Sequence, residues 1–359
     1  MAANLTSIAI STRRVVRYGI FFIIFMTVAR GVLAVGLNIY NSVVPKPPPA
    51  PTVRFGKLQA ISFPAPNQDL PQFTYTLETT TGSLPAFPTQ VRVYLMPPYT
   101  STLYSADDAK KNAAALGFAA TPLELSPVLY RYASQKVPSV LEMNIVNGSF
   151  SVSYNLAADS SPLSGLPPAP EVAANQATEL LTQSGTSVLD LTGPTKHEFL
   201  KVEGQNLVRA LSLSDSNLIR INLFRKDYET GLLLEPKKLP AVTLDPNRSN
   251  AWMILSGARD RERQLVAAQV RHFKIDEKRF ETYPIKTAAT AFEELKTGKG
   301  YIANLGLNKD GNITIRKVYL AYFDPDNATS LYYQPVVVFE GDREFFAYVP
   351  AVNSTYYGE

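Results

Sequence analysis

Few residues of the kinds that carry out catalysis or hold metal ions are present in this chain of 359 residues. It has no cysteine and only two histidines, His197 and His272, which are far apart in the sequence. Without cysteine there are no disulfides and no thiolate metal ligands, and neither histidine lies in a metal-binding pattern such as His-Glu-x-x-His. We therefore expect no metal site, and we expect His272 to be an ordinary residue of a strand.

Two short segments have the composition of ligand-binding loops but not the required order or spacing. Residues 298–300 read Gly-Lys-Gly, yet the predicted helix precedes them, whereas a phosphate-binding loop is followed by its helix. Gly298 is therefore predicted to end that helix. Asp324, Asp326 and Asn327 lie close together but lack the glycine and terminal glutamate of a calcium loop, so a turn is expected there.

Acidic residues and nucleotide motifs give no better candidate for an active site. Glu293 and Glu294 are adjacent in a predicted helix, and adjacent positions do not share a helix face, so both are expected to be solvated. The sequence has no Gly-x-Ser-x-Gly, Walker or dinucleotide-binding motif. Its net charge of +4 is small, which argues against nucleic acid as a partner. We therefore predict a protein that is not an enzyme and needs no cofactor.

The first element that would position a functional surface is an apolar segment at residues 19–40. At the rise of an α-helix it is long enough to cross a hydrocarbon core of about 30 Å. Three arginines precede it: Arg13, Arg14 and Arg17. No acidic residue occurs before Asp69, so the positive-inside rule places residues 1–18 in the cytoplasm. The sequence thus predicts a single-pass protein of the cell membrane whose C-terminal region is extracytoplasmic.

One charge, Arg30, lies within this apolar segment. A charge at such a depth costs roughly 2.5–3.5 kcal/mol on insertion scales unless it pairs or reaches the interface. Arg30 is therefore a candidate contact with a membrane helix of a partner, and snorkelling to the outer interface is the alternative. For the whole segment the alternative is a cleaved signal peptide with its apolar core at residues 20–29, although no clean small-x-small cleavage site follows.

Two proline-rich segments divide the remainder of the chain. Residues 41–52 contain Lys-Pro-Pro-Pro-Ala-Pro and are predicted to form an extended stalk, and residues 161–170 are predicted to be a linker. Composition on either side of the linker indicates strands and helices in both parts. The predicted modules are residues 53–160, 171–276 and 277–359.

Alternating polar and apolar residues predict an α+β fold made of mainly antiparallel sheets, each packed with a short helix. Residues 73–80 and 90–97 are predicted to be paired strands, and Asn147-Gly148 is predicted to turn a hairpin. Helices are expected from residue 105, at residues 171–183 and at residues 288–296. In the last module, the helix is expected to lie against an antiparallel sheet of four strands.

The C-terminal residues resemble a known family. The segments TYPIKTAATAFEELKTGKGYI, VYLAYF, YQPVVVFEG and FFAYVPA, between Thr282 and Ala351, are similar to the YycH/YycI regulatory proteins of Gram-positive bacteria. The resemblance covers residues 277–359, and the proline-rich stalk departs from it. It implies a cystatin/PepSY-like extracytoplasmic unit on a single-span anchor, and a membrane protein such as a sensor kinase as the partner.

Tyrosine is concentrated in this last module, where nine of the 19 tyrosines of the chain lie between Tyr283 and Tyr357. Such enrichment is typical of a recognition face, and cross-strand aromatic packing is the alternative. If the helix covers one face of the sheet, the other face would be free. Strict alternation along residues 313–323 then directs Arg316 and Tyr322 outward, which makes them candidate partner-binding residues.

The function expected from these features is that of a membrane-anchored regulatory or scaffolding protein. It would bind a membrane protein or a component of the cell envelope. The alternative is a cystatin/PepSY-like module that inhibits a protease or binds a substrate, and an enzyme with an unfamiliar carboxylate site is a more distant one. A deep pocket lined by convergent carboxylates would favour the enzyme.

Overall fold

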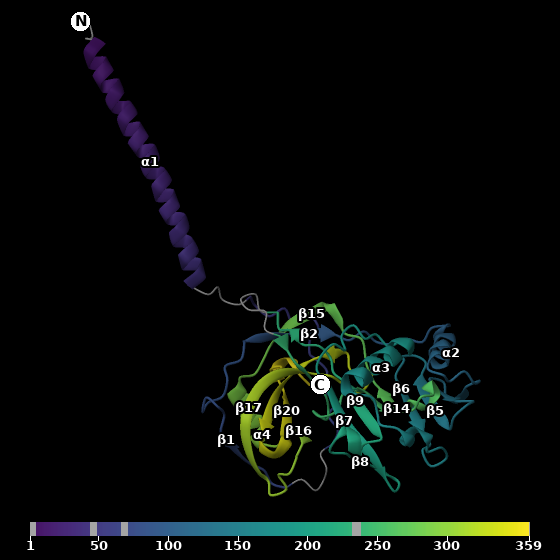
Figure 1. Ribbon diagram of the computed structural model, residues 1–359. Helices are drawn as coiled ribbons and strands as arrows, with labels where there is room; N and C mark the ends of the chain where they lie inside the picture. Colours follow the sequence, from purple (N-terminus) through teal and green to yellow (C-terminus); the bar gives the residue numbers. More distant parts are fainter. Residues whose placement is uncertain (1–4, 44–48, 66–70, 232–237, 359) are drawn as a thin grey trace. The chain divides into compact units, whose positions relative to one another are not determined.

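The computed structural model describes residues 5–43, 49–65, 71–231 and 238–358. The chain forms two compact units, Met1–Ala50 and Pro51–Glu359. The first unit contains one helix and the second contains all the strands (Figure 1). Residues 44–48 of the predicted stalk lie outside the described residues.

The first unit is the single helix α1 (Leu5–Val43). Its segment Thr12–Tyr40 has a mean hydropathy of 2.3 and is the candidate membrane span among the residues described. Apolar side chains are exposed all around it, which is typical of a helix that lies in a membrane. By length and composition α1 is compatible with a membrane anchor or with a signal sequence.

The larger sheet of the second unit has nine strands, and every neighbouring pair is antiparallel. In spatial order the strands are β3 (Leu123–Ser126), β4 (Leu129–Ala133), β5 (Ser139–Asn144), β6 (Phe150–Tyr154), β14 (Leu265–Val270), β13 (Ala251–Ser256), β9 (Leu218–Leu223), β7 (Thr195–Glu203) and β8 (Asn206–Arg209). The predicted Asn147-Gly148 hairpin joins β5 to β6, and Gly148 has the positive φ of 73° that such a turn requires.

Two helices, α2 (Ser105–Ala115) and α3 (Pro170–Gln183), cover one face of this sheet (Figure 1). Small residues on the helices, among them Ala113 and Ala177, let them approach the sheet closely. They pack on apolar side chains that alternate along the strands, such as Met253 on β13 and Ile221 on β9. One core therefore joins elements from residue 109 to residue 270.

The nine-stranded sheet continues across the predicted linker at residues 161–170. Strand β6 precedes the linker and pairs with β14, which follows it by about a hundred residues along the chain. The linker itself is packed: a Cβ placed on Gly257 at the end of β13 would lie 1.8 Å from the backbone oxygen of Leu166. The modules predicted at residues 53–160 and 171–276 are therefore not separate in the structure.

The second sheet has the strand order β1-β17-β19-β20-β16, with β12 also paired to β17. Its strands are β1 (Thr74–Leu77), β17 (Asn312–Phe323), β19 (Pro335–Gly341), β20 (Phe345–Pro350), β16 (Tyr301–Asn304) and β12 (Ala241–Val242). The last four strands of the path are antiparallel, and α4 (Ala288–Lys296) packs against them. The prediction of a helix on four antiparallel strands is confirmed.

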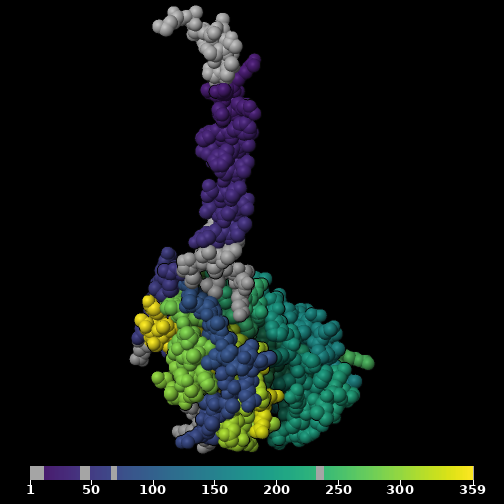
Figure 2. Space-filling view, turned by 90° about the vertical axis from the view of Figure 1, so that its left-hand side faces the viewer, coloured from purple at the N-terminus to yellow at the C-terminus, as the bar shows by residue number. Residues whose placement is uncertain are grey.

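Residues 73–80 and 90–97 do form strands, but the prediction that they pair is wrong. Strand β1 pairs in parallel with β17. Strand β2 (Gln90–Leu95) instead lies between β15 (Asp276–Pro284) and β18 (Tyr332–Tyr333). In Figure 2 the blue residues that follow α1 in sequence lie against the green and yellow residues of the C-terminal part. The predicted C-terminal module thus includes strands from much earlier in the chain.

The remaining elements are short. Strands β10 (Tyr228–Glu229) and β11 (Lys238–Leu239) form a two-stranded pair. Single turns of 3-10 helix are η1 (Ser161–Ser164), η2 (Leu213–Asp215), η3 (Arg261–Arg263), η4 (Asp342–Glu344) and η5 (Ser354–Tyr356).

A bulge in β17 changes which residues face the core. Ile315 lies opposite Gly341, but Lys317 lies opposite Glu340, so Arg316 is the extra residue. Beyond the bulge the alternation is shifted by one position. Ile313 and Ile315 before it therefore share one cluster with Val318, Leu320 and Tyr322 after it.

Both faces of the second sheet are covered. The face opposite α4 carries Phe323, Val338 and Tyr348, which pack against residues 61–63 and 242–244. The expectation of a broad free face on this sheet is therefore wrong.

Candidate functional site

Arg316, one of the two predicted partner-binding residues, is on the surface and is already paired. Its side chain is 48% exposed. Its Nε and Nη2 atoms donate to the two carboxylate oxygens of Asp342 at 2.8 and 2.6 Å, and Nη1 donates to Glu78 at 2.7 Å. The hydrogen bonds from Arg316 lower the pKa of Asp342. A partner would have to displace two carboxylates to reach this guanidinium.

Tyr322, the other predicted partner-binding residue, is in the core. It is 0% exposed, its ring stacks on Tyr333 with centroids 5.0 Å apart, and its hydroxyl donates to the backbone oxygen of Arg92 at 2.8 Å. Burial raises its pKa well above the usual value for tyrosine. The predicted outward orientation is wrong because the bulge at Arg316 reverses the alternation.

Because Tyr322 is buried and Arg316 is exposed, alanine substitutions at the two positions should differ strongly in their effect on stability. Tyr322→Ala should lower the free energy of unfolding by about 3–5 kcal/mol, because it leaves a cavity and an unpaired backbone oxygen. Arg316→Ala should leave the unfolding midpoint almost unchanged, since it removes only exposed ion pairs. Denaturant unfolding followed by circular dichroism would measure both, and equal midpoints for the two variants would contradict the assignment.

Arg30, the predicted membrane contact, lies within α1, where its side chain is exposed. The structure contains no bilayer and no partner chain, so the two interpretations of Arg30 stay predictions.

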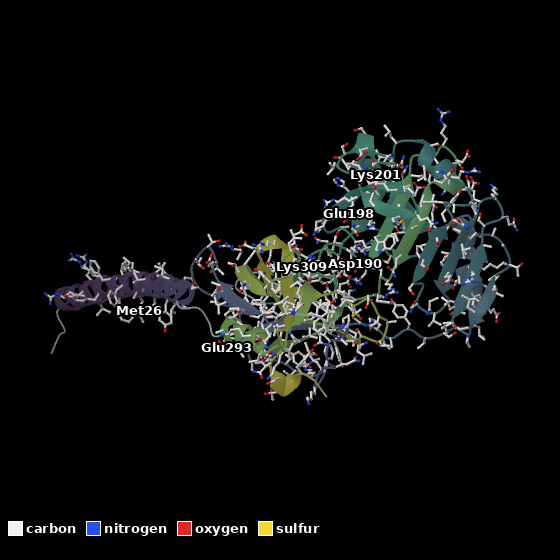
Figure 3. All side chains as sticks on the ribbon, turned by 90° about the horizontal axis from the view of Figure 1, so that it is seen from below. Met26, Asp190, Glu198, Lys201, Glu293 and Lys309 are labelled. Carbon is white, nitrogen blue, oxygen red and sulfur yellow. The ribbon has the colours of Figure 1, made fainter. Side chains whose placement is uncertain are left out.

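A cluster of buried charges connects the two sheets, with Arg225 at its centre. Arg225 follows β9, and its side chain is 0% exposed. Its Nε donates to Asp324 at 2.7 Å, its Nη1 pairs with Asp190, and its Nη2 donates to the backbone oxygen of Phe273 at 2.5 Å. Asp324 follows β17 of the second sheet, so this side chain bridges both sheets. In Figure 3, Asp190 lies between the yellow-green C-terminal strands and the teal strands.

His272 also belongs to this buried charge cluster and is not an ordinary strand residue as expected. It lies beyond the end of β14, and its Nε2 is 2.7 Å from Asp190 Oδ1. Because Asp190 can only accept, we assign the proton to Nε2. Burial alone would raise the pKa of Asp190, but the hydrogen bond from His272 and the charge of Arg225 lower it below the usual value.

The buried charge cluster is almost entirely enclosed. The side chain of Arg225 is 0% exposed, and those of His272, Asp324 and Asp190 are 4%, 5% and 15% exposed. No group of three or more His, Cys, Asp or Glu is arranged for a metal ion among the residues described. The cluster is therefore best understood as the connection between the sheets.

Removing Arg225 should destabilise the protein strongly, because two carboxylates would stay buried without a counter-charge. We expect Arg225→Met to lower the free energy of unfolding by about 3–5 kcal/mol. The matched control is Arg248→Met, which removes an exposed pair with Asp245 and should have little effect. Calorimetric unfolding of both variants is the test, and similar melting temperatures for the two would show that Arg225 does not connect the sheets.

Two open cavities lie beside α4. One of about 470 Å³ has an aromatic lining, including Phe63, Tyr75 and Tyr301, and is also lined by Lys296 and Lys299. The other, of about 420 Å³, is lined by residues 84–89 and 285–289 at the start of α4. Neither described lining contains a carboxylate or a histidine. Neither cavity therefore presents the convergent acidic groups that would favour an enzyme.

The surface with the most distinctive chemistry is the face of the nine-stranded sheet opposite α2 and α3, which we call the open face. One row of cross-strand neighbours runs over it. In order from β4 to β13 the row consists of Arg131, Glu142, Ser151, Gln269 and Trp252. All five side chains are exposed or half-buried, so the row can contact a ligand. Next to the row, part of this face is a buried apolar cluster that includes Ile254 and Leu218, and Leu156, Leu163 and Trp252 pack against it.

Trp252 is the only tryptophan in the chain, and polar neighbours hold it in place. Its Nε1 donates to Gln269 Oε1 at 3.2 Å. The guanidinium of Arg220 lies 5.3 Å from the ring centroid and pairs with Glu198 at 2.8 Å. Figure 3 shows Glu198 on the teal strands of this sheet. These contacts fix the ring while leaving it half-buried, as in a preformed recognition site.

The sequence alone did not reveal the open face. The single tryptophan of the chain, which lies in β13, was the available signal. The neighbours of Trp252 come from strands that are distant in the chain, so the row becomes visible only when the strand order is known.

Comparisons with known proteins give little further information. The sequence matches no family model and no curated protein. A solved structure with some similarity is that of an uncharacterized protein from Eubacterium rectale ATCC 33656. It is 13% identical over 76% of this chain and 85% of that chain, with a TM-score of 0.41. Similarity at this level supports no inference about function, and the resemblance to YycH/YycI proteins stays a prediction.

Proposed function

We propose that this is a membrane-anchored extracytoplasmic protein that acts by binding, as a regulator or scaffold, and that its recognition surface is the open face of the nine-stranded sheet. The observation that carries the proposal is the exposed row from Arg131 to Trp252. The opposite face of the same sheet is covered by α2 and α3. An exposed face with an ordered aromatic side chain is typical of a binding surface.

The cellular location of the protein is the other part of the proposal. The apolar helix α1 would act as an uncleaved anchor, with the arginines before it in the cytoplasm and residues 51–359 outside. Two classes of partner would be present at this location: a component of the cell envelope, or a membrane protein such as the sensor kinase that the resemblance implies. A cystatin/PepSY-like packing is a further part of that resemblance and is proposed only for residues 277–359.

The anchor can be tested by fractionation. The protein should stay in the membrane after high-salt and carbonate washes, because a spanning helix is held by the apolar core of the bilayer. Protease added outside intact cells or spheroplasts should digest residues 51–359. A soluble form that begins near residues 30–40, detected by N-terminal sequencing, would show that α1 is cleaved as a signal sequence instead.

The recognition surface can be tested by crosslinking in native membranes. A photo-reactive amino acid at Ser153, which is exposed on the open face, should give crosslinked products that contain a partner. Ser354 is the matched control, since it is exposed in η5, outside the nine-stranded sheet, and should give none of these products. The same products from both positions, or none from Ser153, would show that the open face is not the recognition surface.

A further inference from the structure

We propose that the open face binds an uncharged polysaccharide in an extended conformation. This inference rests on the proposed function, and it names the chemical class of the ligand. Its starting point is the side chain of Trp252. An indole ring is large, rigid and apolar, and it stacks against the C–H face of a pyranose ring without requiring any charge on the sugar.

The neighbours of Trp252 provide the hydrogen bonds that sugar hydroxyls need. Gln269 is next to it in the row, followed by Ser151 and Glu142. A carboxamide, a hydroxyl and a carboxylate together offer both donors and acceptors, which matches hydroxyl groups that act as both. All three side chains are half-buried, so they are partly ordered before a ligand arrives.

An extended chain would lie across the strands, along the row from Glu142 to Trp252. Beside this row, Ser153 on β6 and Ala267 on β14 are small neighbours, so no bulky side chain stands next to Ser151 and Gln269 on these two strands. Val140 on β5 and the buried Ile254 on β13 flank the two small residues, and Arg220 on β9 follows Ile254.

Charge on this face favours a neutral ligand. Arg131 pairs with Glu142 and Arg220 pairs with Glu198, so each of these two arginines is balanced by a carboxylate. A polyanion would meet no excess of positive charge, and its own charge would be repelled by the two glutamates. A protein partner would normally bury a group of large apolar side chains at the centre of its interface. Here the centre of the row is Ser151 and Gln269, with the small residues Ser153 and Ala267 beside them.

The length of the site predicts how many sugar residues it holds. From Glu142 on β5 to Trp252 on β13 there are three steps between neighbouring strands, each of about 4.8 Å. The row therefore extends over roughly 14 Å, which corresponds to about three pyranose rings of a β-1,4-linked chain. Affinity should increase from the monosaccharide to the trisaccharide and change little beyond that length.

The single tryptophan makes this proposal directly measurable. Fluorescence of Trp252 in the full-length protein in lipid nanodiscs would be followed during titration with β-1,4-linked oligomers of N-acetylglucosamine and of glucose, from one to six residues. We expect saturable quenching or a spectral shift with at least one series, and an affinity that levels off at the trimer. No change with either series at millimolar concentration would overturn the proposal, as would tighter binding of the polyanion heparin.

Variants separate binding along the row from indirect effects. Ser153→Arg places a large side chain at an exposed position beside the row and should weaken binding by about tenfold or more, whereas Ser354→Arg should leave binding unchanged. Trp252→Ala, followed by calorimetry, should weaken binding to a similar extent. The melting temperature of Trp252→Ala shows whether that variant is folded. Ser153→Arg tests the site independently, because it does not alter the core. Equal affinity of Ser153→Arg and the unchanged protein would overturn the proposed site.

The outcome also distinguishes this inference from the function on which it rests. If photo-crosslinks from Ser153 contain a protein and no oligosaccharide binds, the open face is a recognition surface but the polysaccharide assignment is wrong. If Ser153 gives no specific crosslink and no oligosaccharide binds, both the proposed function and this inference are wrong.

Discussion

The guanidinium of Arg225 is the point at which the two large sheets are held together. It is fully buried between strands of both sheets and is neutralised by Asp190 and Asp324. A buried charge of this kind is costly unless all its donors are paired, and here Asp190, Asp324 and a backbone oxygen satisfy them. Tyr228 and His272 in turn hold Asp190. The relative position of the sheets within residues 51–359 depends on this geometry.

This arrangement decides which surfaces remain for recognition. The second sheet has apolar side chains on both faces, and each face is covered within the chain. The nine-stranded sheet uses one face for α2 and α3 and, on the other, leaves the row from Arg131 to Trp252 exposed or half-buried. The tyrosines that suggested a recognition face in the C-terminal part instead pack on one another, as the contacts of Tyr322 with Tyr94 and Tyr333 show. Trp252 on the other sheet is instead a half-buried aromatic side chain in a row of exposed and half-buried polar residues.

The sequence predicted local structure well where apolar residues recur with the period of one helix or one strand. Helix α4 begins and ends as its apolar stripe indicated, and the four strands around it follow their alternation. Two kinds of information were missing. The bulge at Arg316 adds a single residue to β17, which alternation alone does not detect, and it reversed the orientation of Tyr322. The pairing of β1 with β17 joins residues 238 positions apart, a distance over which local patterns give no signal.

The position of β1 has a consequence for how the chain acquires its fold. Strands β1 and β2 are made early, yet their partners β15, β17 and β18 come from the last quarter of the sequence. Contacts of such long range are slow to form, because the loop between the partners must close first. Because the chain is synthesised from its N-terminus, the second sheet can close only after nearly all of the polypeptide has been made. In that interval β1 and β2 are open strand edges, which are prone to pair with other chains.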